Sequence, residues 1–241
     1  MAVKAIGTAR KGYNRTKKLQ RTALRAVGFD LDNTLVMSEE EKAKIIARVF
    51  CKFYNVDNGV KKSYIKLVGE GKTREEKFRI LYRKVFRKGI SVGEFSKISL
   101  EFSKEYLKFM AKCPLAVCVN ILRELRRQVG LMFVVSMEEE RDIRLILKRC
   151  RISDCFNDIR GGPKSKEENL RYLLRTYKLK PKEVVYVGDA KNDVLAAKRL
   201  GIKFIGVNRN FRVLHLLKKL GADFVFSDLC KIPTVIKKKI K

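Results

Sequence analysis

Short apolar runs alternate with helix-like segments over most of the chain. The runs are rich in Val, Ile and Phe and lie at residues 25–30, 131–136, 156–160, 183–189, 203–208 and 223–228. Before each of the last five runs, apolar residues recur every three or four positions, which is the period of a helix packed on one face. The expected helices span residues 115–129, 137–150, 166–178, 191–200 and 211–220. Uniformly apolar strands that alternate with helices predict an α/β, Rossmann-like core with a parallel sheet covered on both faces.

Residues 35–112 follow a different pattern, because they show only helical spacing. Apolar residues occupy one face of the segment 39–55. Two capping-box spacings, Thr73 with Glu76 and Ser91 with Glu94, predict the starts of two more helices. We therefore expect an all-helical cap domain at 35–112, inserted into a core made of residues 24–34 and 113–241.

Excess positive charge is spread along the whole chain and is most extreme at its two ends. Of 56 basic and 26 acidic residues, which give a net charge of +30, residues 1–23 hold seven basic and no acidic side chains. Few large apolar residues accompany them, so this segment is expected to be a flexible basic arm. The charge would attract polyanions, and non-specific nucleic-acid binding through the basic ends remains an alternative to a general basic bias of the proteome.

Composition excludes several other classes. No run of 18 uncharged apolar residues occurs, so no membrane span is expected. The N-terminus lacks the apolar stretch of a secretory signal. The six cysteines include no CxxC, and His215 is the only histidine, which argues against a zinc site and favours reduced cysteines in a cytoplasmic protein. The sequence indicates no particular oligomeric state.

Two carboxylates end the first apolar run. Asp30 and Asp32 in VGFDLDNTLV are two positions apart, and an extended chain places them on one side. Like charges this close favour a cation such as Mg²⁺ between them, or a proton on one of them. Ser136 and Asp189 also end apolar runs. Because ligands bind at the carboxyl ends of parallel strands, these residues are expected to converge at one rim.

The same segments resemble the haloacid dehalogenase (HAD) superfamily of phosphohydrolases. DLDNT at 30–34 resembles its first motif, VVSM at 134–137 its second, the lysine of GGPKSK its third, and GDAKND at 188–193 its fourth. The helical insert resembles the cap of one HAD class. The resemblance points to the phosphoglycolate phosphatase-like branch, which acts on small soluble phosphates.

Charge and the resemblance assign the same roles. Asp30 is the expected nucleophile and Asp32 the proton carrier, while Ser136 donates a hydrogen bond to a phosphoryl oxygen. Lys164 is expected to neutralise the transferring group. Lys166 competes for that role, but Ser165 with Glu168 is a capping-box spacing that places Lys166 inside a helix. The proline that usually follows this lysine in the family is replaced by Ser165.

Further contacts complete the expected site. Ser136 also has capping-box spacing with Glu139, which predicts a helix beginning at Met137 whose amides help to bind phosphate. Magnesium and substrate each have an expected set of contacts. Asp30, the main-chain carbonyl of Asp32, Asp189 and Asp193 are the expected Mg²⁺ ligands, and Asn33, Thr34 and Met137 are expected to contact substrate.

The segment VGEGKT at 68–73 resembles the end of a P-loop. The full motif needs glycine where Lys66 stands, and the segment lies in the helical insert rather than at a sheet edge, so a nucleotide site is not expected. Either the segment is a plain turn before a helix, or it is a cap loop that contacts an anionic tail of the substrate. The residues of such a loop would be Gly69, Gly71, Lys72 and Arg74.

Together these features predict a Mg²⁺-dependent hydrolase of small phosphorylated metabolites that works through an aspartyl-phosphate. Two alternatives remain open. The first is a protein that binds or processes nucleic acid with this fold, suggested by the charge. The second is an inactive scaffold, against which stands the presence of every motif residue.

Overall fold

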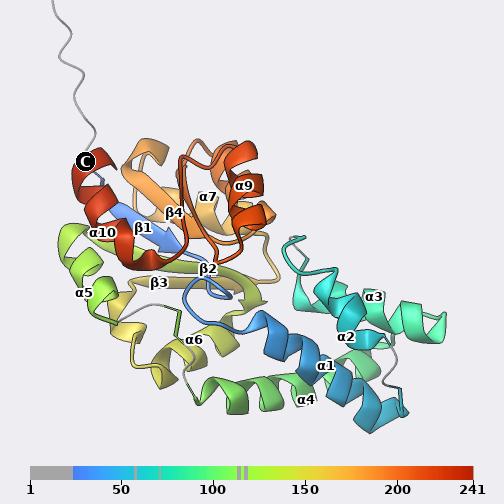
Figure 1. Cartoon of the computed structure of the whole chain (residues 1–241). Coiled ribbons are helices and arrows are strands. Elements are labelled where there is room, and N and C mark those ends of the chain that lie inside the picture. Colours follow the sequence, from blue (N-terminus) through green and yellow to red (C-terminus); the bar gives the residue numbers. More distant parts are fainter. Residues whose placement is uncertain (1–23, 57–58, 71, 113–114, 117–118, 241) are drawn as a thin grey trace, which may run out of the picture.

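The protein forms a parallel sheet with a helical insert at the carboxyl ends of its strands (Figure 1). The computed structural model describes residues 24–240 apart from 57–58, 71, 113–114 and 117–118. The basic arm expected at 1–23 lies outside the described residues. No helix in the described part of the chain is both long and apolar enough to cross a membrane.

The sheet has six parallel strands in the order β3-β2-β1-β4-β5-β6. This order puts β1 at the centre, where Phe29 is level with Val134 of β2 and Val187 of β4. The strands are β1 (Ala26–Phe29), β2 (Leu131–Glu139), β3 (Asp158–Gly162), β4 (Val184–Gly188), β5 (Lys203–Val207) and β6 (Phe224–Phe226). All six predicted strands are confirmed, and the last residues of β1, β2 and β4 come to one rim.

Helices cover both faces of the sheet because alternate strand residues point to opposite sides. Val27 and Phe29 pack into one core with α5 (Val119–Gln128), α6 (Glu140–Arg149) and α10 (Ile232–Val235). Ala26 and Phe133 pack into the other core. That second core is covered by α7 (Lys166–Thr176), α8 (Lys191–Arg199) and α9 (Phe211–Lys219).

The predicted helical insert is present between β1 and α5. It comprises α1 (Glu39–Tyr54), α2 (Val60–Ile65), α3 (Arg74–Phe86) and α4 (Val92–Met110). Both predicted capping boxes form, at Thr73 and at Ser91. The short helix α2 was not predicted. Phe50, Phe78 and Phe102 are fully buried in the insert, whose apolar core continues into that of the sheet.

The predicted helix start at Met137 is wrong. β2 continues to Glu139, and its pairing with β3 shifts register between Val135 and Glu139. The helix α6 begins only at Glu140, and Glu139 precedes it without a side-chain cap hydrogen bond. The capping box expected between Ser136 and Glu139 is therefore absent, because both residues belong to an extended strand.

Candidate active site

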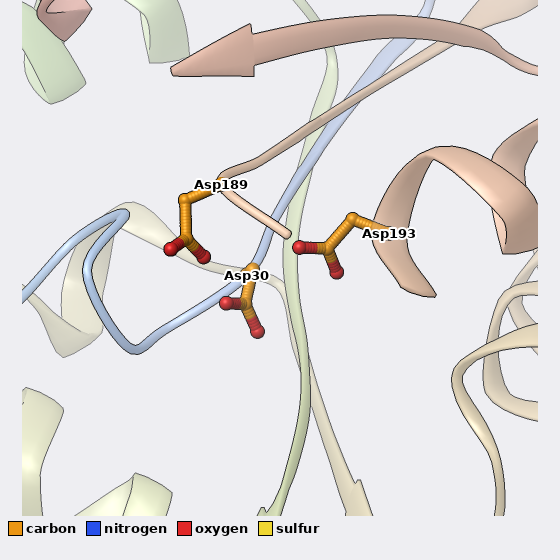
Figure 2. A group of neighbouring side chains, drawn as sticks. All are labelled: Asp30, Asp189 and Asp193. Atoms are coloured by element: carbon orange, nitrogen blue, oxygen red, sulfur yellow. The ribbon is translucent and has the colours of Figure 1, made fainter. Parts of the chain in front are cut away.

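Three carboxylates meet at the rim of the sheet. Asp30 follows β1, Asp189 follows β4, and Asp193 lies in the first turn of α8 (Figure 2). One oxygen from each lies within 4.8 Å of the others. All three residues are buried, with 4%, 8% and 0% of their surface exposed. The predicted convergence of Asp30 with the fourth motif is therefore present in the structure.

Close packing holds Asp193 in this cluster. The main-chain amide of Ala190 donates to its carboxylate at 3.0 Å, and the hydroxyl of Tyr186 lies 3.4 Å away. A Cβ atom placed on Gly188 would lie 2.5 Å from the carboxyl carbon of Asp193. Glycine at the end of β4 thus leaves room for the carboxylate against the strand.

Lys166 is the cation of the cluster. Its ammonium lies 2.6 Å from the carboxylate of Asp30 and also donates to Asp193. Burial alone would lower the pKa of Lys166, but the carboxylates of Asp193 and Asp30 raise it above its ordinary value. Lys166 therefore stays charged. We call Asp30, Asp189, Asp193 and Lys166 the strand-end cluster.

The preference for Lys164 is not supported by the structure. Its side chain is exposed, and its ammonium lies 5.9 Å from the centre of the Tyr172 ring rather than in the cluster. The predicted cap at Ser165 does form, so Lys166 opens α7. Side chains in a helix lean toward its N-terminus, which lets this first-turn lysine reach back to the sheet rim. Lys164 precedes the N-cap residue Ser165 and therefore remains in the outer loop.

The strand-end cluster carries more negative than positive charge. Burial raises the pKa of Asp30 to about 7, with Lys166 opposing the rise and Asp193 adding to it. Burial, together with the charges of Asp30 and Asp193, also holds the pKa of Asp189 well above its usual range. The three carboxylates supply the oxygen ligands that Mg²⁺ prefers, and their negative charge exceeds that of the one ammonium beside them. The residues therefore fit a divalent cation.

Asp32 is held by the helical insert. Its carboxylate accepts hydrogen bonds from the hydroxyls of Ser38 and, at 3.0 Å, Tyr106, and it lies 2.5 Å from the ammonium of Lys42. Asp30 and Asp32 line the same cavity, as the DxD spacing predicted. The second carboxylate of the motif thus contacts cap groups from the linker, α1 and α4.

Not all of the residues expected to contact the phosphate or the substrate line the cavity. Ser136 is buried, lines the cavity with Met137, and its hydroxyl accepts from the amide of Glu138 at 3.2 Å. Asn33 lines the same cavity. Thr34 does not, because its side chain lies in the wall of a neighbouring cavity beside Met37. Ser136, Met137 and Asn33 are therefore placed for substrate contact, and Thr34 is not.

A second buried group of charges joins cap and core, and sequence reasoning missed it. Lys42 contacts Asp32 and, at 2.9 Å, Glu138. Arg74 pairs with Glu138 at 2.6 Å and Asp142 at 2.7 Å. We call these five residues the cap–core cluster. Only Lys42 could have been found from the sequence. It lies three residues before Ile45, so the helical period places this lysine on the apolar face of its helix, where a charge is unusual.

The loop at 68–74 contributes both to the cavity wall and to the cap–core cluster. Gly69 and Lys72 line the reaction cavity, as expected of a loop that meets the substrate. Arg74 turns instead into the cap–core cluster, with 4% of its surface exposed. Gly71 lies outside the described residues. The cavity is small, about 40 Å³, and Lys77 of α3 completes its cap side.

Comparison with known proteins identifies the family. The sequence profile of haloacid dehalogenase-like hydrolases matches residues 27–207. The chain belongs to this family. A phosphoglycolate phosphatase of Pasteurella multocida is 25% identical over 225 residues, which cover 89% of this chain and 99% of that protein. One from Haemophilus influenzae is 23% identical with the same coverage.

Solved structures agree with the family. A predicted phosphoglycolate phosphatase from Haemophilus somnus is 25% identical, covers 88% of this chain and 97% of its own, and superposes with a TM-score of 0.73. The HAD hydrolase YfnB of Bacillus subtilis, bound to magnesium, shares the fold at 14% identity, 89% and 99% coverage and a TM-score of 0.67. The HAD hydrolase described here is a phosphatase, and it is similar to phosphoglycolate phosphatases over most of its length.

Proposed function

We propose that this HAD phosphatase hydrolyses a small phosphomonoester with Mg²⁺, through a phosphorylated Asp30. The strand-end cluster carries the proposal, because Asp30 lies beside one lysine and two further carboxylates at the end of the central strand. Mg²⁺ held by Asp30, Asp189, Asp193 and the carbonyl of Asp32 would screen the negative charge of the nucleophile and polarise a phosphoryl oxygen.

The first step transfers the phosphoryl group to the protein. An oxygen of Asp30 bonds to phosphorus as the ester P–O bond breaks, and Asp32 gives its proton to the leaving oxygen. Lys166 balances charge on the transferring group, and the hydroxyl of Ser136 donates to one of its oxygens. The helical cap, which contacts Asp32 through Ser38, Lys42 and Tyr106, keeps the proton carrier at the cavity wall.

The second step releases phosphate. Asp32, now a carboxylate, takes a proton from water as the water oxygen bonds to phosphorus. The bond between phosphorus and Asp30 breaks, so the carboxylate is restored and inorganic phosphate leaves. Both steps use the same residues with the proton moving in opposite directions, as microscopic reversibility allows. The closed cap would limit access of bulk water to the cavity.

The direct test is phosphate release from a panel of small phosphomonoesters, with Mg²⁺ or with a chelator. We expect release only with the metal, and Asp30→Asn should lower turnover at least about 1,000-fold because the nucleophile is lost. Asp154→Asn, an exposed carboxylate outside the site, is the matched control and should retain wild-type turnover. Full activity of Asp30→Asn would exclude the covalent mechanism.

Nucleic-acid binding is a second candidate, favoured by the net charge of +30. It requires an RNA or DNA affinity that falls steeply with salt concentration and is lost when residues 1–23 are deleted. It is compatible with phosphatase activity, since the basic ends and the strand-end cluster are separate parts of the chain.

A further inference from the structure

The amino ends of the strands form the edge of the sheet opposite the candidate active site. In a parallel α/β fold each connecting helix runs back to this edge, so the helix ends and the segments that lead into the next strands meet there. Helices α5 to α9 all have basic residues in their last turn. We call this face the amino edge. It consists of Arg25 and residues 126–130, 148–157, 175–183, 198–203 and 218–223.

The amino edge carries a large excess of positive charge. Arg25 and the five segments together hold 15 basic and three acidic residues. The helix dipole favours cations at a helix C-terminus, which accounts for one or two in each last turn. The loops add more, because Lys178, Lys180 and Lys182 all lie beyond the end of α7. Helix stabilisation therefore does not account for the whole excess.

Most of these cations have no carboxylate partner. Glu183 pairs with Arg25 at 3.3 Å, Asp223 lies 3.7 Å from Lys198, and Arg199 pairs with a carboxylate of α7 at 3.3 Å. The other twelve basic side chains of the amino edge form no ion pair with the described residues, and all but two of them are exposed. Their charge is therefore available to an external anion.

Contacts across the central strand make the face continuous. The guanidinium of Arg126 donates to the carbonyl of Gly130, and the amide of Leu131 donates to the carbonyl of Arg25 at 3.0 Å. The Arg25 guanidinium in turn donates to the carbonyl of Lys178 at 3.2 Å. The basic ends of α5 and α7 are thus joined through the start of β1.

The side chains of the amino edge favour a double-stranded nucleic acid over other large anions. Single strands are bound by stacking of their bases on aromatic side chains, and membranes by insertion of apolar ones. None of the described residues of this edge is a large exposed apolar side chain. A duplex keeps its bases stacked inside and presents its phosphates, which basic side chains bind without such groups.

We propose that the amino edge binds the phosphate backbone of double-stranded RNA or DNA. The proposal rests on the nucleic-acid candidate above, whose surface and partner it names, and is independent of the phosphatase activity. With strands about 4.8 Å apart, the edge of six strands is about 24 Å wide, which matches about seven base pairs. The chain enters β1 here, so residues 1–23, with seven basic and no acidic side chains, are attached to the same edge.

The test removes charge from the amino edge of the full-length chain. The triple variant Arg127→Gln, Lys180→Gln, Lys182→Gln changes three exposed cations that have no carboxylate partner among the described residues. Fluorescence anisotropy with RNA and DNA duplexes of about 20 base pairs should show a rise in Kd of at least about tenfold. The slope of log Kd against log salt should fall by about 2–3, because up to three phosphate contacts are lost.

A second triple variant controls for net charge. Lys61→Gln, Lys66→Gln, Lys88→Gln removes the same charge from exposed cap lysines, and it should leave Kd within about twofold and the salt slope unchanged. Both triple variants should keep the Tm and phosphate release of wild type, because neither alters a residue of the reaction cavity. Binding of either duplex with this difference between the variants supports the proposal, and the tighter duplex is the preferred partner.

Other results would overturn the proposal. Equal weakening by both triple variants would show attraction by net charge alone. Unchanged binding in the amino-edge variant, with loss on deletion of residues 1–23, would keep the nucleic-acid candidate and assign it to the arm. Tighter binding of single strands, or binding only to vesicles of anionic phospholipid, would exclude a duplex as the partner. No binding by wild type would refute the amino edge and the nucleic-acid candidate together, and leave the phosphatase function intact.

Discussion

The two buried charge clusters of this phosphatase lie side by side but are balanced to different degrees. In the strand-end cluster, three carboxylates share the single ammonium of Lys166. In the cap–core cluster, each carboxylate is in contact with Lys42 or Arg74. The residues of both clusters are buried, so burial alone does not distinguish them.

The pKa values of one carboxylate from each cluster, Asp30 and Glu138, shift in opposite directions. Burial raises the pKa of Asp30 to about 7, because one lysine does not compensate for desolvation and two neighbouring acids. Burial would also raise the pKa of Glu138, but Lys42 and Arg74 hold it well below its usual range. The larger excess of carboxylates in the strand-end cluster therefore indicates a place for a cation, whereas the more nearly balanced cap–core cluster also joins the cap to the core.

The largest effect is expected from breaking the cap–core cluster. Arg74→Met leaves Glu138 and Asp142 buried beside one fewer cation, which should lower the free energy of unfolding by about 3–5 kcal/mol. Arg79→Met on the same helix breaks an exposed pair with Glu75 and should cost less than about 1 kcal/mol. Urea unfolding measures both. A similar loss in the free energy of unfolding for the two variants would contradict a structural role of the cap–core cluster.

A smaller effect, on turnover rather than stability, is expected from Lys166, the cation of the strand-end cluster. Lys166→Met should lower kcat about 100- to 1,000-fold, because charge on the transferring phosphoryl group loses its nearest ammonium. Lys164→Met is the matched control two residues away and should remain within about twofold of wild type. Phosphate release under saturating Mg²⁺ compares them. A greater loss in Lys164→Met would reverse the assignment made from the structure.

The smallest effect is a dependence of metal-free stability on pH. Because folding raises the pKa of Asp30 from 3.8 to about 7, the folded protein holds a proton that the unfolded chain releases, and stability falls as pH rises between those values. We expect a loss of about 1–3 kcal/mol from pH 5 to pH 8 in the presence of chelator.

Magnesium should reverse this trend. The metal-induced rise in Tm is expected to be greater at pH 8 than at pH 5, because the carboxylates bind the cation only when ionised. Glu138 has a lowered pKa, so its contribution is present throughout this range and is lost only in stronger acid. Calorimetry with and without Mg²⁺ tests the contrast. An equal Tm shift at both pH values would count against a metal in the strand-end cluster.

The fold was predictable because its signals are local and repeated. Apolar strands at regular intervals, and capping boxes at Thr73, Ser91 and Ser165, predicted the sheet, the insert and three helix starts that the structure confirms. The end of β2 was not predictable in this way. Ser136 and Glu139 have the spacing of a cap, and only pairing with β3 keeps them extended.

The site was predictable in its strand-end carboxylates and not in its lysines. Asp30 and Asp189 were placed by a rule about strand ends, which needs no knowledge of side-chain direction. The choice between Lys164 and Lys166 depended on which side chain leans back from a helix start. Lys77, which completes the cap side of the cavity, belongs to none of the sequence motifs.

Gly188 gives the site a constraint of another kind. With no side chain, it takes part in no chemical step, yet a methyl group there would overlap the carboxyl group of Asp193. In a saturation library selected for catalysis, this position should tolerate substitution as poorly as the acid that it faces. In a library selected only for folding, shortening Asp193 to alanine should restore tolerance at 188. Selection for Asp193 thus also constrains position 188, because a side chain there would occupy the space of the carboxyl group.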